Sequence, residues 1–354
     1  KESWQRFWLK DIKELFEEIS PIRDYTKKEL ELWFLDHEFG QTKYKSDFEA
    51  KDNNDSFDAP LRVRAKLVNL KTKEVKEQEV FLTDFPLMTE RGTFIVNGVE
   101  RVAISQLIRS PGAFFTSQVF AGKNYFGAKI IPNRGAWLEF ETEATGFIGV
   151  KIDRKRKVAA TTLLRALGVY KEEQLKEVFK KVDIGELKYL DETLKRDHSK
   201  DEAEALVEVY RVLRPNELVT PDTAREFIEN VFFNFERYDL SKVGRWRMWQ
   251  RLPDLEPKKE EISVQERVLT KEDVVAVIRE VIRLNNDPKG RPDQIDHLGN
   301  RRVRTFNELL QNRLRIGLVR MERIIKDRMA TLDPDSLTPS QLLNPRPVMA
   351  VVKE

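Results

Sequence analysis

The sequence predicts an α+β fold in two domains, because three signals of regular structure follow one another along the chain. Apolar residues recur at helical spacing in residues 4–19, at every second position from about residue 60, and again at helical spacing over residues 160–284. Separate helical and strand segments are typical of helices packed on mostly antiparallel sheets. We therefore expect a first domain of a helix and a sheet, and a second domain that begins near Ser110.

An apolar stripe predicts an amphipathic helix over residues 4–19. Ser3 precedes the stripe as a candidate N-cap, and Pro21 ends it because proline cannot continue a helix. The apolar residues of the stripe are Trp4, Phe7, Trp8, Ile12, Leu15, Phe16 and Ile19. From Leu61 onward apolar and polar residues alternate as they do in strands, and Arg-Gly and Asn-Gly turn sequences interrupt the pattern.

The longest predicted helix begins after Thr305, which would form a capping box with Glu308. Its apolar face, which we expect to cover the first sheet, consists of Phe306, Leu309, Leu310, Leu314, Leu318, Met321, Ile325 and Met329. The opposite face of this helix is basic.

The composition favours a globular protein and excludes several chemistries. The 354 residues contain 63 Lys and Arg against 60 Asp and Glu, so net charge alone does not indicate a nucleic-acid binder. The absence of cysteine excludes disulfides, thiolate zinc sites and a cysteine nucleophile, and it suits a cytoplasmic protein. The sequence has neither an apolar run long enough for a membrane helix nor a signal peptide. Both ends stop in mid-pattern, and we expect them to be cut from a longer chain.

The residue patterns that catalysis requires are missing from the sequence. His37, His198 and His297 are far apart in unrelated contexts, which argues against a histidine metal site or a catalytic triad. The segment most similar to a phosphate loop, residues 122–127, is followed by Ala128 where that motif requires lysine. No aspartate cluster suits a two-magnesium nucleotidyl-transfer site. We therefore expect a catalytically inactive chain without a metal or cofactor of its own.

Two basic stretches are candidates for contact with nucleic-acid phosphates. One is residues 154–157, and the other extends into the long helix with Arg301, Arg302, Arg304, Arg313, Arg315, Arg320 and Arg323. Arginine binds phosphates and base edges with two hydrogen bonds, but composition alone favours a solvated helix face held by Glu308 and Glu322. Trp137 follows the turn of residues 132–135 and is either a platform for base stacking or a buried core residue.

Long segments of the chain resemble the β subunit of bacterial RNA polymerase. The first is FPLMTERGTFIVNGVERVAISQLIRSPGAFF at residues 85–115, and IIPNRGAWLEFE, VKIDRKRK, IDHLGNRRVRTFNELLQNRLRIGLVRMER and SLTPSQLLNPRPV follow in the order of the family. The similarity covers nearly the whole chain from Ala59 onward and is looser over residues 1–58. It implies that the chain forms outer lobes of the subunit and lacks the catalytic parts.

In this family the protrusion, or β1 lobe, consists of two stretches of chain, and the lobe, or β2 lobe, is inserted between them. The resemblance therefore implies a discontinuous protrusion of helices and an antiparallel sheet over residues 1–108 and 297–354. The inserted lobe, mixed but largely helical, would span residues 109–296. Both parts line the DNA cleft in the family.

The resemblance also implies a pocket for a flipped guanine of the non-template strand, at Arg109, Asp296 and Arg301. Such a pocket is chemically reasonable, because a carboxylate accepts hydrogen bonds from N1 and N2 of guanine while arginine reaches O6 or N7. Trp137 matches the residue of the family that stacks on the neighbouring unpaired base.

Four further positions match the family with less specific motifs. Asp153, Arg214 and Arg237 match positions of the lobe near the same strand, and for all three the alternative is a salt bridge within the domain. Gln106 matches the edge of the rifamycin pocket.

A docking site for transcription factors is implied at Val75, Lys76 and Glu77, where the family commonly has Ile-Lys-Glu on a strand of the protrusion. There the transcription-repair coupling translocase and CarD-like regulators add a strand of their own. Valine keeps the β-branched character of an edge strand, and the two charged residues protect such an edge from unspecific pairing. The alternative is an edge whose charges serve solubility alone.

The resemblance implies a part of RNA polymerase that acts in transcription by holding the non-template strand and the downstream duplex. Its partners would be DNA, the other polymerase subunits, sigma factor and the regulators named above, while another subunit would bind the catalytic magnesium. The alternative function is a protein-interaction module that adds a strand to its partner and binds no DNA in isolation.

Overall fold

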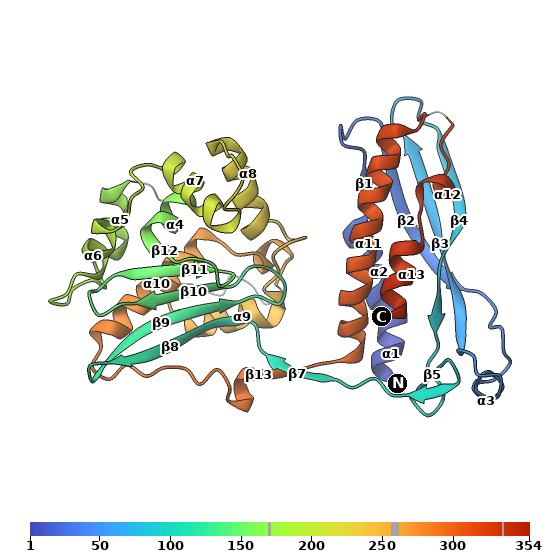
Figure 1. The fold of residues 1–354 in the computed structure, drawn as a ribbon, viewed down its shortest axis with the longest axis horizontal. Helices are drawn as coiled ribbons and strands as arrows, with labels where there is room; N and C mark the ends of the chain where they lie inside the picture. Colours follow the sequence, from blue (N-terminus) through green and yellow to red (C-terminus); the bar gives the residue numbers. More distant parts are fainter. Residues whose placement is uncertain (169–170, 256–261, 335) are drawn as a thin grey trace. The chain divides into compact units, whose positions relative to one another are not determined.

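The computed structural model describes residues 1–168, 171–255, 262–334 and 336–354. The chain divides into two compact units, Lys1–Leu107 with Val303–Glu354, and Ile108–Arg302. Both units combine helices with antiparallel sheets, so the predicted α+β class is confirmed (Figure 1). The names protrusion and lobe for these parts stay a prediction.

The first unit contains a four-stranded antiparallel sheet in the order β1-β2-β3-β4. Its strands are β1 (Ile22–Arg23), β2 (Leu30–Phe39), β3 (Asp58–Asn69) and β4 (Val75–Pro86). The alternation that predicted strands is present in β3, where Leu61, Val63, Ala65 and Leu67 are buried and the residues that alternate with them are more exposed. β4 ends the order, and no further strand of the described residues pairs with its outer edge.

Helices from both ends of the chain pack on this sheet. They are α1 (Glu2–Arg6), α2 (Ile12–Ile19), α11 (Phe306–Thr331), α12 (Pro339–Leu342) and α13 (Arg346–Lys353). A π-helical turn, Phe7–Asp11, separates α1 from α2, so the helix predicted over residues 4–19 is present with an irregularity. Phe7, Met321 and Leu32 belong to one buried apolar cluster, which joins the N-terminal helices, α11 and the sheet.

The N-terminus of α11 is capped differently from the sequence prediction. Thr305 is the N-cap residue, but its hydroxyl donates to the side chain of Asn307 at 2.6 Å, and the capping box with Glu308 does not form. Ser3, predicted to cap the first helix, lies inside α1, and its hydroxyl accepts the backbone N–H of Asn307 at 3.1 Å. Asn307 is buried and donates to the carboxylate of Asp11 at 2.6 Å. Contacts between distant segments therefore replace the predicted capping box and the predicted cap at Ser3.

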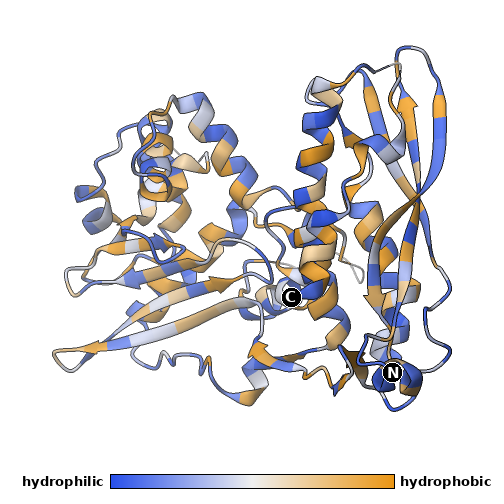
Figure 2. Ribbon diagram, turned by 45° about the vertical axis from the view of Figure 1, so that its right-hand side comes forward, coloured by the Kyte–Doolittle hydropathy of each residue, from blue (hydrophilic) through white to orange (hydrophobic). Residues whose placement is uncertain are grey.

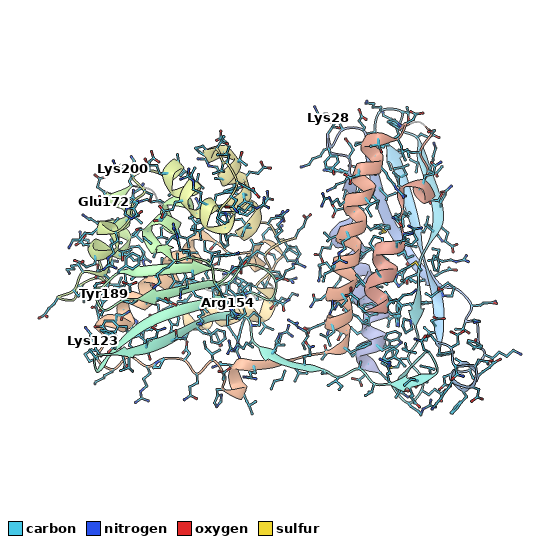
Figure 3. All side chains as sticks on the ribbon, viewed as in Figure 1. Lys28, Lys123, Arg154, Glu172, Tyr189 and Lys200 are labelled. Atoms are coloured by element: carbon cyan, nitrogen blue, oxygen red, sulfur yellow. The ribbon has the colours of Figure 1, made fainter. Side chains whose placement is uncertain are left out.

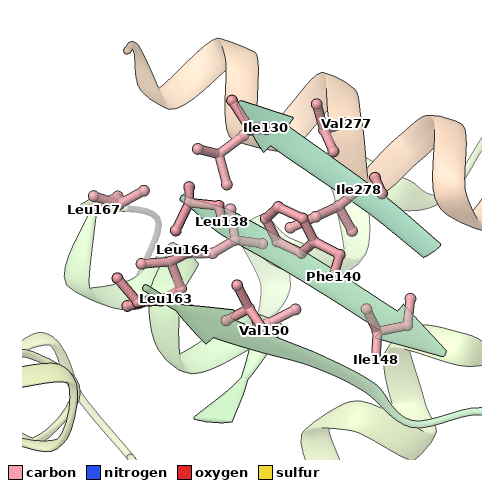
Figure 4. Close-up of a cluster of buried hydrophobic side chains, with 14 of the residues drawn as sticks. Ile130, Leu138, Phe140, Ile148, Val150, Leu163, Leu164, Leu167, Val277 and Ile278 are labelled. Atoms are coloured by element: carbon pink, nitrogen blue, oxygen red, sulfur yellow. The ribbon is translucent and has the colours of Figure 1, made fainter. Parts of the chain in front are cut away.

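The second unit is built on a five-stranded antiparallel sheet in the order β12-β11-β10-β9-β8. Its strands are β8 (Gly112–Phe120), β9 (Lys123–Ile131), β10 (Leu138–Thr142), β11 (Ile148–Ile152) and β12 (Val158–Ala159). Their pairing places Leu138, Phe140 and Val150 on one face, where all three are buried. Figure 4 shows side chains of α4 (Ala160–Ala166) and α10 (Lys271–Asn286) meeting these strand residues in the core.

Charged side chains alternate with the core residues on the strands of this sheet. Lys129 bonds to Glu139 at 2.8 Å across β9 and β10. Lys151 and Lys157 bond to Glu141 at 2.7 and 2.9 Å. Because neighbouring residues of a strand point to opposite faces, this ladder lies on the face opposite the apolar core. Figure 2 shows the same alternation of hydrophilic and hydrophobic residues along the strands.

Further helices complete the second unit and confirm the prediction of a helical region after residue 160. They are α5 (Glu172–Phe179), α6 (Tyr189–Lys195), α7 (Glu202–Leu213), α8 (Pro221–Phe232) and α9 (Ser241–Arg251), with short 3-10 turns at Gln265–Arg267 and Leu298–Asn300. The smaller elements of the first unit are α3 (Asp47–Asp52), β5 (Phe94–Val96) and β6 (Val99–Arg101). Among the described residues no helix combines the length and apolar character needed to cross a membrane.

The chain passes from the first unit to the second along β7 (Gln106–Arg109) and returns along β13 (Arg301–Arg304). These two strands pair with each other in a separate two-stranded sheet. Residues that are far apart in the sequence are thereby brought together at the edge of the second unit.

Candidate nucleic-acid interface

Two arginines bind one carboxylate in the second unit. Arg109, the last residue of β7, donates from Nε and Nη2 to Oδ1 of Asp296 at 3.3 and 3.1 Å, across a separation of 187 residues. Arg301, the first residue of β13, donates from Nη2 to the same oxygen at 2.9 Å. The pairing of β7 with β13 explains why they converge. The structure thus brings together the three residues that the resemblance assigned to one pocket.

The carboxylate of Asp296 is ionised, and one of its two oxygens accepts all the hydrogen bonds that the described residues donate to it. Hydrogen bonds from Arg301 and Arg109 lower its pKa below the ordinary value for aspartate. All the bonds that it accepts end on Oδ1, and Oδ2 accepts none from the described part of the chain. The side chain of Asp296 is 65% exposed, compared with 40% for Arg109 and 31% for Arg301. One oxygen of an anionic acceptor, flanked by two guanidinium groups, is therefore available to a ligand.

Backbone contacts position the loop that carries Asp296. The N–H of Ser110 donates to the carbonyl of Asn300 at 2.9 Å, and the N–H of Gly299 donates to Nδ1 of His297 at 3.0 Å. Arg247 of α9 donates to the side chain of Asn300 at 3.0 Å and to the carbonyl of Gly299. Sequence reasoning missed Arg247, because nothing in the local pattern of α9 indicates a contact some fifty residues further on.

Trp137 is half-buried directly before β10, and Asp153 holds its backbone. The N–H of Trp137 donates to Oδ1 of Asp153 at 2.8 Å, and the N–H of Asp153 donates to the carbonyl of Trp137 at 2.9 Å. The alternative role of Asp153, a salt bridge within the domain, is therefore not what the structure shows. Its carboxylate fixes the segment that carries the indole.

Arg154 covers one face of the Trp137 indole. Its guanidinium carbon lies 5.4 Å from the ring centroid, which is a cation–π distance. Asp153 and Arg154 have φ angles of 46° and 59°, and this left-handed pair turns the chain toward Trp137 directly after β11. Figure 3 labels the exposed Arg154 at one end of the sheet. The sequence indicated Arg154 as a phosphate contact but did not predict its contact with Trp137.

The loop before Trp137 is packed tightly against the segment that precedes α9. The N–H groups of Asn133 and Arg134 donate to the carbonyl of Asp239 at 2.9 and 3.0 Å. Gly135 has a φ of +125°, and a Cβ atom there would lie 2.7 Å from the ring of the buried Tyr238. A glycine is therefore required at this position both for its conformation and for its close approach.

Arg237 and Arg214 have different surroundings. The exposed Arg237 forms no salt bridge with any residue that the structure describes, so the alternative proposed for it from the sequence is not observed. Arg214 follows the predicted alternative instead: it bonds to Glu217 at 3.1 Å and lies 4.7 Å from the ring centroid of Phe227. Its contacts thus lie with α8 and the loop after α7, whereas Arg237 stands next to the Tyr238 contact of Gly135.

Some residues of the two basic stretches already form salt bridges within the protein. Lys157 bonds to Glu141 in the charged ladder, so it is less available to phosphates than Arg154 is. In α11 the guanidinium of Arg315 binds both carboxylate oxygens of Glu18 in α2 at 2.9 to 3.1 Å. The predicted continuous basic set also divides between the two units, because Arg302 belongs to the second unit and Arg304 to the first.

The candidate docking residues Val75, Lys76 and Glu77 begin the edge strand β4. Val75 pairs with Val68 and Glu77 with Lys66, whereas Lys76 is opposite the buried Leu67. Val75 and Glu77 are therefore on the face away from the helices, and Lys76 is on the helix side of the sheet. Their backbone belongs to the strand with the unpaired edge. Gln106, assigned to the edge of a rifamycin pocket, is exposed on β7, and that assignment stays a prediction.

The described ranges contain no group of three or more His, Asp or Glu side chains that could hold a metal ion. The side chain of His37 is 8% exposed and lies beside Phe16, and His297 accepts a backbone hydrogen bond in a 3-10 turn. The cluster around Asp296 is suited to hydrogen bonding of a ligand that offers donors, and Trp137 is suited to stacking.

Comparison with known proteins supports the resemblance found in the sequence. The family described as RNA polymerase Rpb2, domain 2, matches residues 111–304. A DNA-directed RNA polymerase subunit beta of Chloroflexus aggregans is 46% identical over 380 aligned positions. The similarity covers 99% of this chain but only 31% of that relative, so the chain spans about a third of the length of the relative.

Proposed function

Because the chain belongs to the RNA polymerase Rpb2, domain 2, family, we propose that it is part of an RNA polymerase β subunit and acts in transcription of DNA. Within that enzyme its second unit would bind the separated non-template strand, and the chain would line the path of the downstream duplex. Other polymerase subunits, sigma factor and DNA would be its partners. The site of action would be the cytoplasm, and the catalytic magnesium would be bound by another subunit.

The arrangement around Asp296 is the observation that carries this proposal. An ionised carboxylate with a free Oδ2 can accept the N1 and N2 donors of an unpaired guanine. Arg109 and Arg301 flank this acceptor and can reach O6, N7 or a phosphate without giving up their bonds to Oδ1, since each guanidinium carries five N–H donors. Adenine presents no such donor pair to a carboxylate. The cluster is thus expected to prefer guanine.

Trp137 would provide the second half of the interface. Base stacking on an aromatic side chain accepts every base, so this residue would contribute affinity and the Asp296 cluster would contribute specificity. Since Arg154 lies over one face of the indole, a base would stack on the other face or displace Arg154. Arg237, with its exposed and unengaged side chain, would contact the phosphate backbone.

The dependence of DNA binding on salt tests the proposal. We expect the chain to retain single-stranded DNA at low salt and to lose it as salt rises, with a logarithmic slope of about −0.7 for each phosphate contact. Arg109→Gln should make the slope shallower, whereas Arg279→Gln, which removes an arginine paired with Asp254 elsewhere in the unit, should not. Absence of retention at low salt would favour the alternative, a module that binds proteins alone.

A second function, docking of a protein factor, is favoured by the free edge of β4. A partner strand could pair with the backbone of Val75–Pro86, and Val75 and Glu77 would contact its side chains on the face away from the helices. The transcription-repair coupling translocase and CarD-like regulators are the partners that the resemblance implies. Strand addition relies on backbone hydrogen bonds, so its affinity should respond weakly to salt.

Charge reversal on β4 tests this second function. Glu77→Lys should abolish pull-down of the coupling translocase and leave retention of single-stranded DNA unchanged. Glu29→Lys, at a charged position on the neighbouring loop that is outside β4, serves as the matched control. Equal loss of both activities would mean that the substitution damages the fold of the whole chain, and retained docking would exclude the β4 edge.

A further inference from the structure

A hydrogen bond connects the two halves of the candidate interface. Arg302, directly after Arg301 in β13, donates from Nη2 to Oδ1 of Asn133 at 3.1 Å, across 169 residues. Asn133 belongs to the loop that leads into Trp137, and both partners of this bond are half-buried. The motif IIPNRGAWLEFE contains Asn133 but assigned it no role, and the proposed function does not use it.

The backbone of Asn133 is anchored independently of its side chain. Its N–H donates to the carbonyl of Asp239 at 2.9 Å, and the carboxylate of Asp239 is held by Arg267 at 2.6 and 2.9 Å. The loop therefore keeps its conformation when the side chain of Asn133 is changed. The side chain of Asn133 additionally fixes the position of the loop relative to β13.

A constant distance between the Trp137 platform and the Asp296 cluster matters for the binding of two neighbouring nucleotides. Their bases are joined by one sugar-phosphate step, so a stacked base and a hydrogen-bonded base fit together only if their two sites are held at a constant separation. Sites that drift relative to each other would bind the two bases one at a time and lose the advantage of a preorganised pair.

We propose that Asn133 is a positioning residue that couples the Trp137 platform to the Asp296 cluster through Arg302. This inference rests on the proposed function. The bound ligand is the non-template strand with a guanine in the cluster and the adjacent base on the indole. Asn133 contacts neither base; it sets the distance at which both are bound together.

The test measures open-complex lifetimes with RNA polymerase that contains this chain. Templates carry either guanine or another base at the position read by the cluster, and either a base or an abasic site at the adjacent position. Asp296→Ala should remove the guanine effect alone, and Trp137→Ala should remove the effect of the adjacent base alone. Asn133→Ala should reduce both effects together by roughly three- to tenfold, which corresponds to one hydrogen bond of ordinary net strength.

Two further variants separate positioning from general damage. Asn133→Asp keeps an acceptor for Arg302 and should retain both effects, whereas Asn124→Ala, an exposed asparagine of the same sheet, should change neither. In the double variant with Arg302→Met, Asn133→Ala should cause no additional loss.

The outcomes distinguish the inference from the function on which it rests. If Asn133→Ala leaves both base effects intact, or shortens all lifetimes equally on every template, the coupling is absent and the inference is overturned while the proposed function stands. If the guanine effect in Asp296→Ala and the effect of the adjacent base in Trp137→Ala stay as large as in the unchanged chain, the proposed function itself is wrong.

Discussion

The backbone N–H of Trp137 donates to Oδ1 of Asp153 at 2.8 Å, and the N–H of Asp153 donates back to the carbonyl of Trp137 at 2.9 Å. Asp153 therefore has two tasks, because it also holds a left-handed φ of 46°. Asparagine and glycine adopt this conformation more readily than alanine does, at a difference of about 1 kcal/mol. The two tasks can be separated by substitution.

We expect Asp153→Asn to preserve stacking on Trp137, since it keeps both the acceptor and the turn. Asp153→Gly keeps the turn but loses the acceptor, and Asp153→Ala loses both. The preference of the chain for single-stranded DNA with a base over DNA with an abasic site should therefore decline by a few-fold in the glycine variant and further in the alanine variant. Equal preferences in all three variants would show that Asp153 does not position the indole.

The contact of Ser3 with Asn307 predicts a stability effect across the two ends of the chain. Ser3→Ala removes the hydroxyl that accepts the N–H of Asn307 at the start of α11. We expect the free energy of unfolding of the first unit to fall by about 1 kcal/mol, the usual cost of losing an N-cap. Urea denaturation measures this change, with Glu2→Gln in the same exposed turn as a control. An unchanged midpoint for Ser3→Ala would mean that water replaces the hydroxyl at no cost.

This cap also illustrates what the sequence could and could not predict. The helical period around Phe306 and Leu314 predicted α11 correctly, because burial of one face depends on residues close in sequence. The same reasoning placed Thr305 correctly as the N-cap residue but predicted a cap at Ser3 and a capping box with Glu308 that do not form, since the contact across 304 residues has no local signal. Local patterns thus predict elements better than the polar contacts between them.

The residues of the candidate interface likewise fall into those that the sequence indicated and those that it missed. Resemblance to a family indicated Arg109, Asp296 and Trp137 by motif, and the structure supplies the bonds that connect the first two. Asn133 and Arg247 were missed, because their roles depend on the chain folding back through β13 and α9. Neither residue stands in a pattern whose period or spacing carries information about such a contact.

Burial of His37 predicts a pH dependence of stability in the first unit. Desolvation lowers the pKa of His37 from its ordinary value, although the neighbouring Asp36 opposes the shift and a hydrogen bond with the backbone of Trp8 does so as well. Lys13 adds to the lowering. The unfolded chain therefore binds a proton more readily than the folded chain does, and stability is full above about pH 6.5 and declines as the pH falls toward the lowered pKa.

Urea denaturation at about pH 7.5 and about pH 5.5 measures this effect. The loss of unfolding free energy between the two values should be smaller in His37→Gln than in the unchanged chain, because glutamine does not titrate. His198→Gln serves as the control in the second unit. An identical loss in the unchanged chain and in His37→Gln would assign the pH dependence to other groups.

Asp296→Ala should erase a preference for guanine at one non-template position of the open complex. The carboxylate has two roles open to it: it reads a base through Oδ2, or it neutralises Arg109 and Arg301 through Oδ1 as plain structure. Only the first role depends on the DNA sequence, because guanine alone presents N1 and N2 donors to an acceptor. Lifetimes of open complexes on templates that differ at this base should therefore decrease roughly five- to a hundredfold with guanine and little with the other bases.

A purely structural carboxylate would behave differently on substitution. Its removal would leave two guanidinium groups together without their shared acceptor, and every template would be affected to the same extent. Asp296→Asn distinguishes the roles further, because the amide keeps one acceptor for the arginines but presents a donor or a weaker acceptor to guanine. We expect this variant to hold its structure and lose the guanine preference. A uniform change on all four templates in both variants would make Asp296 a scaffold residue and remove the basis for a guanine pocket at this site.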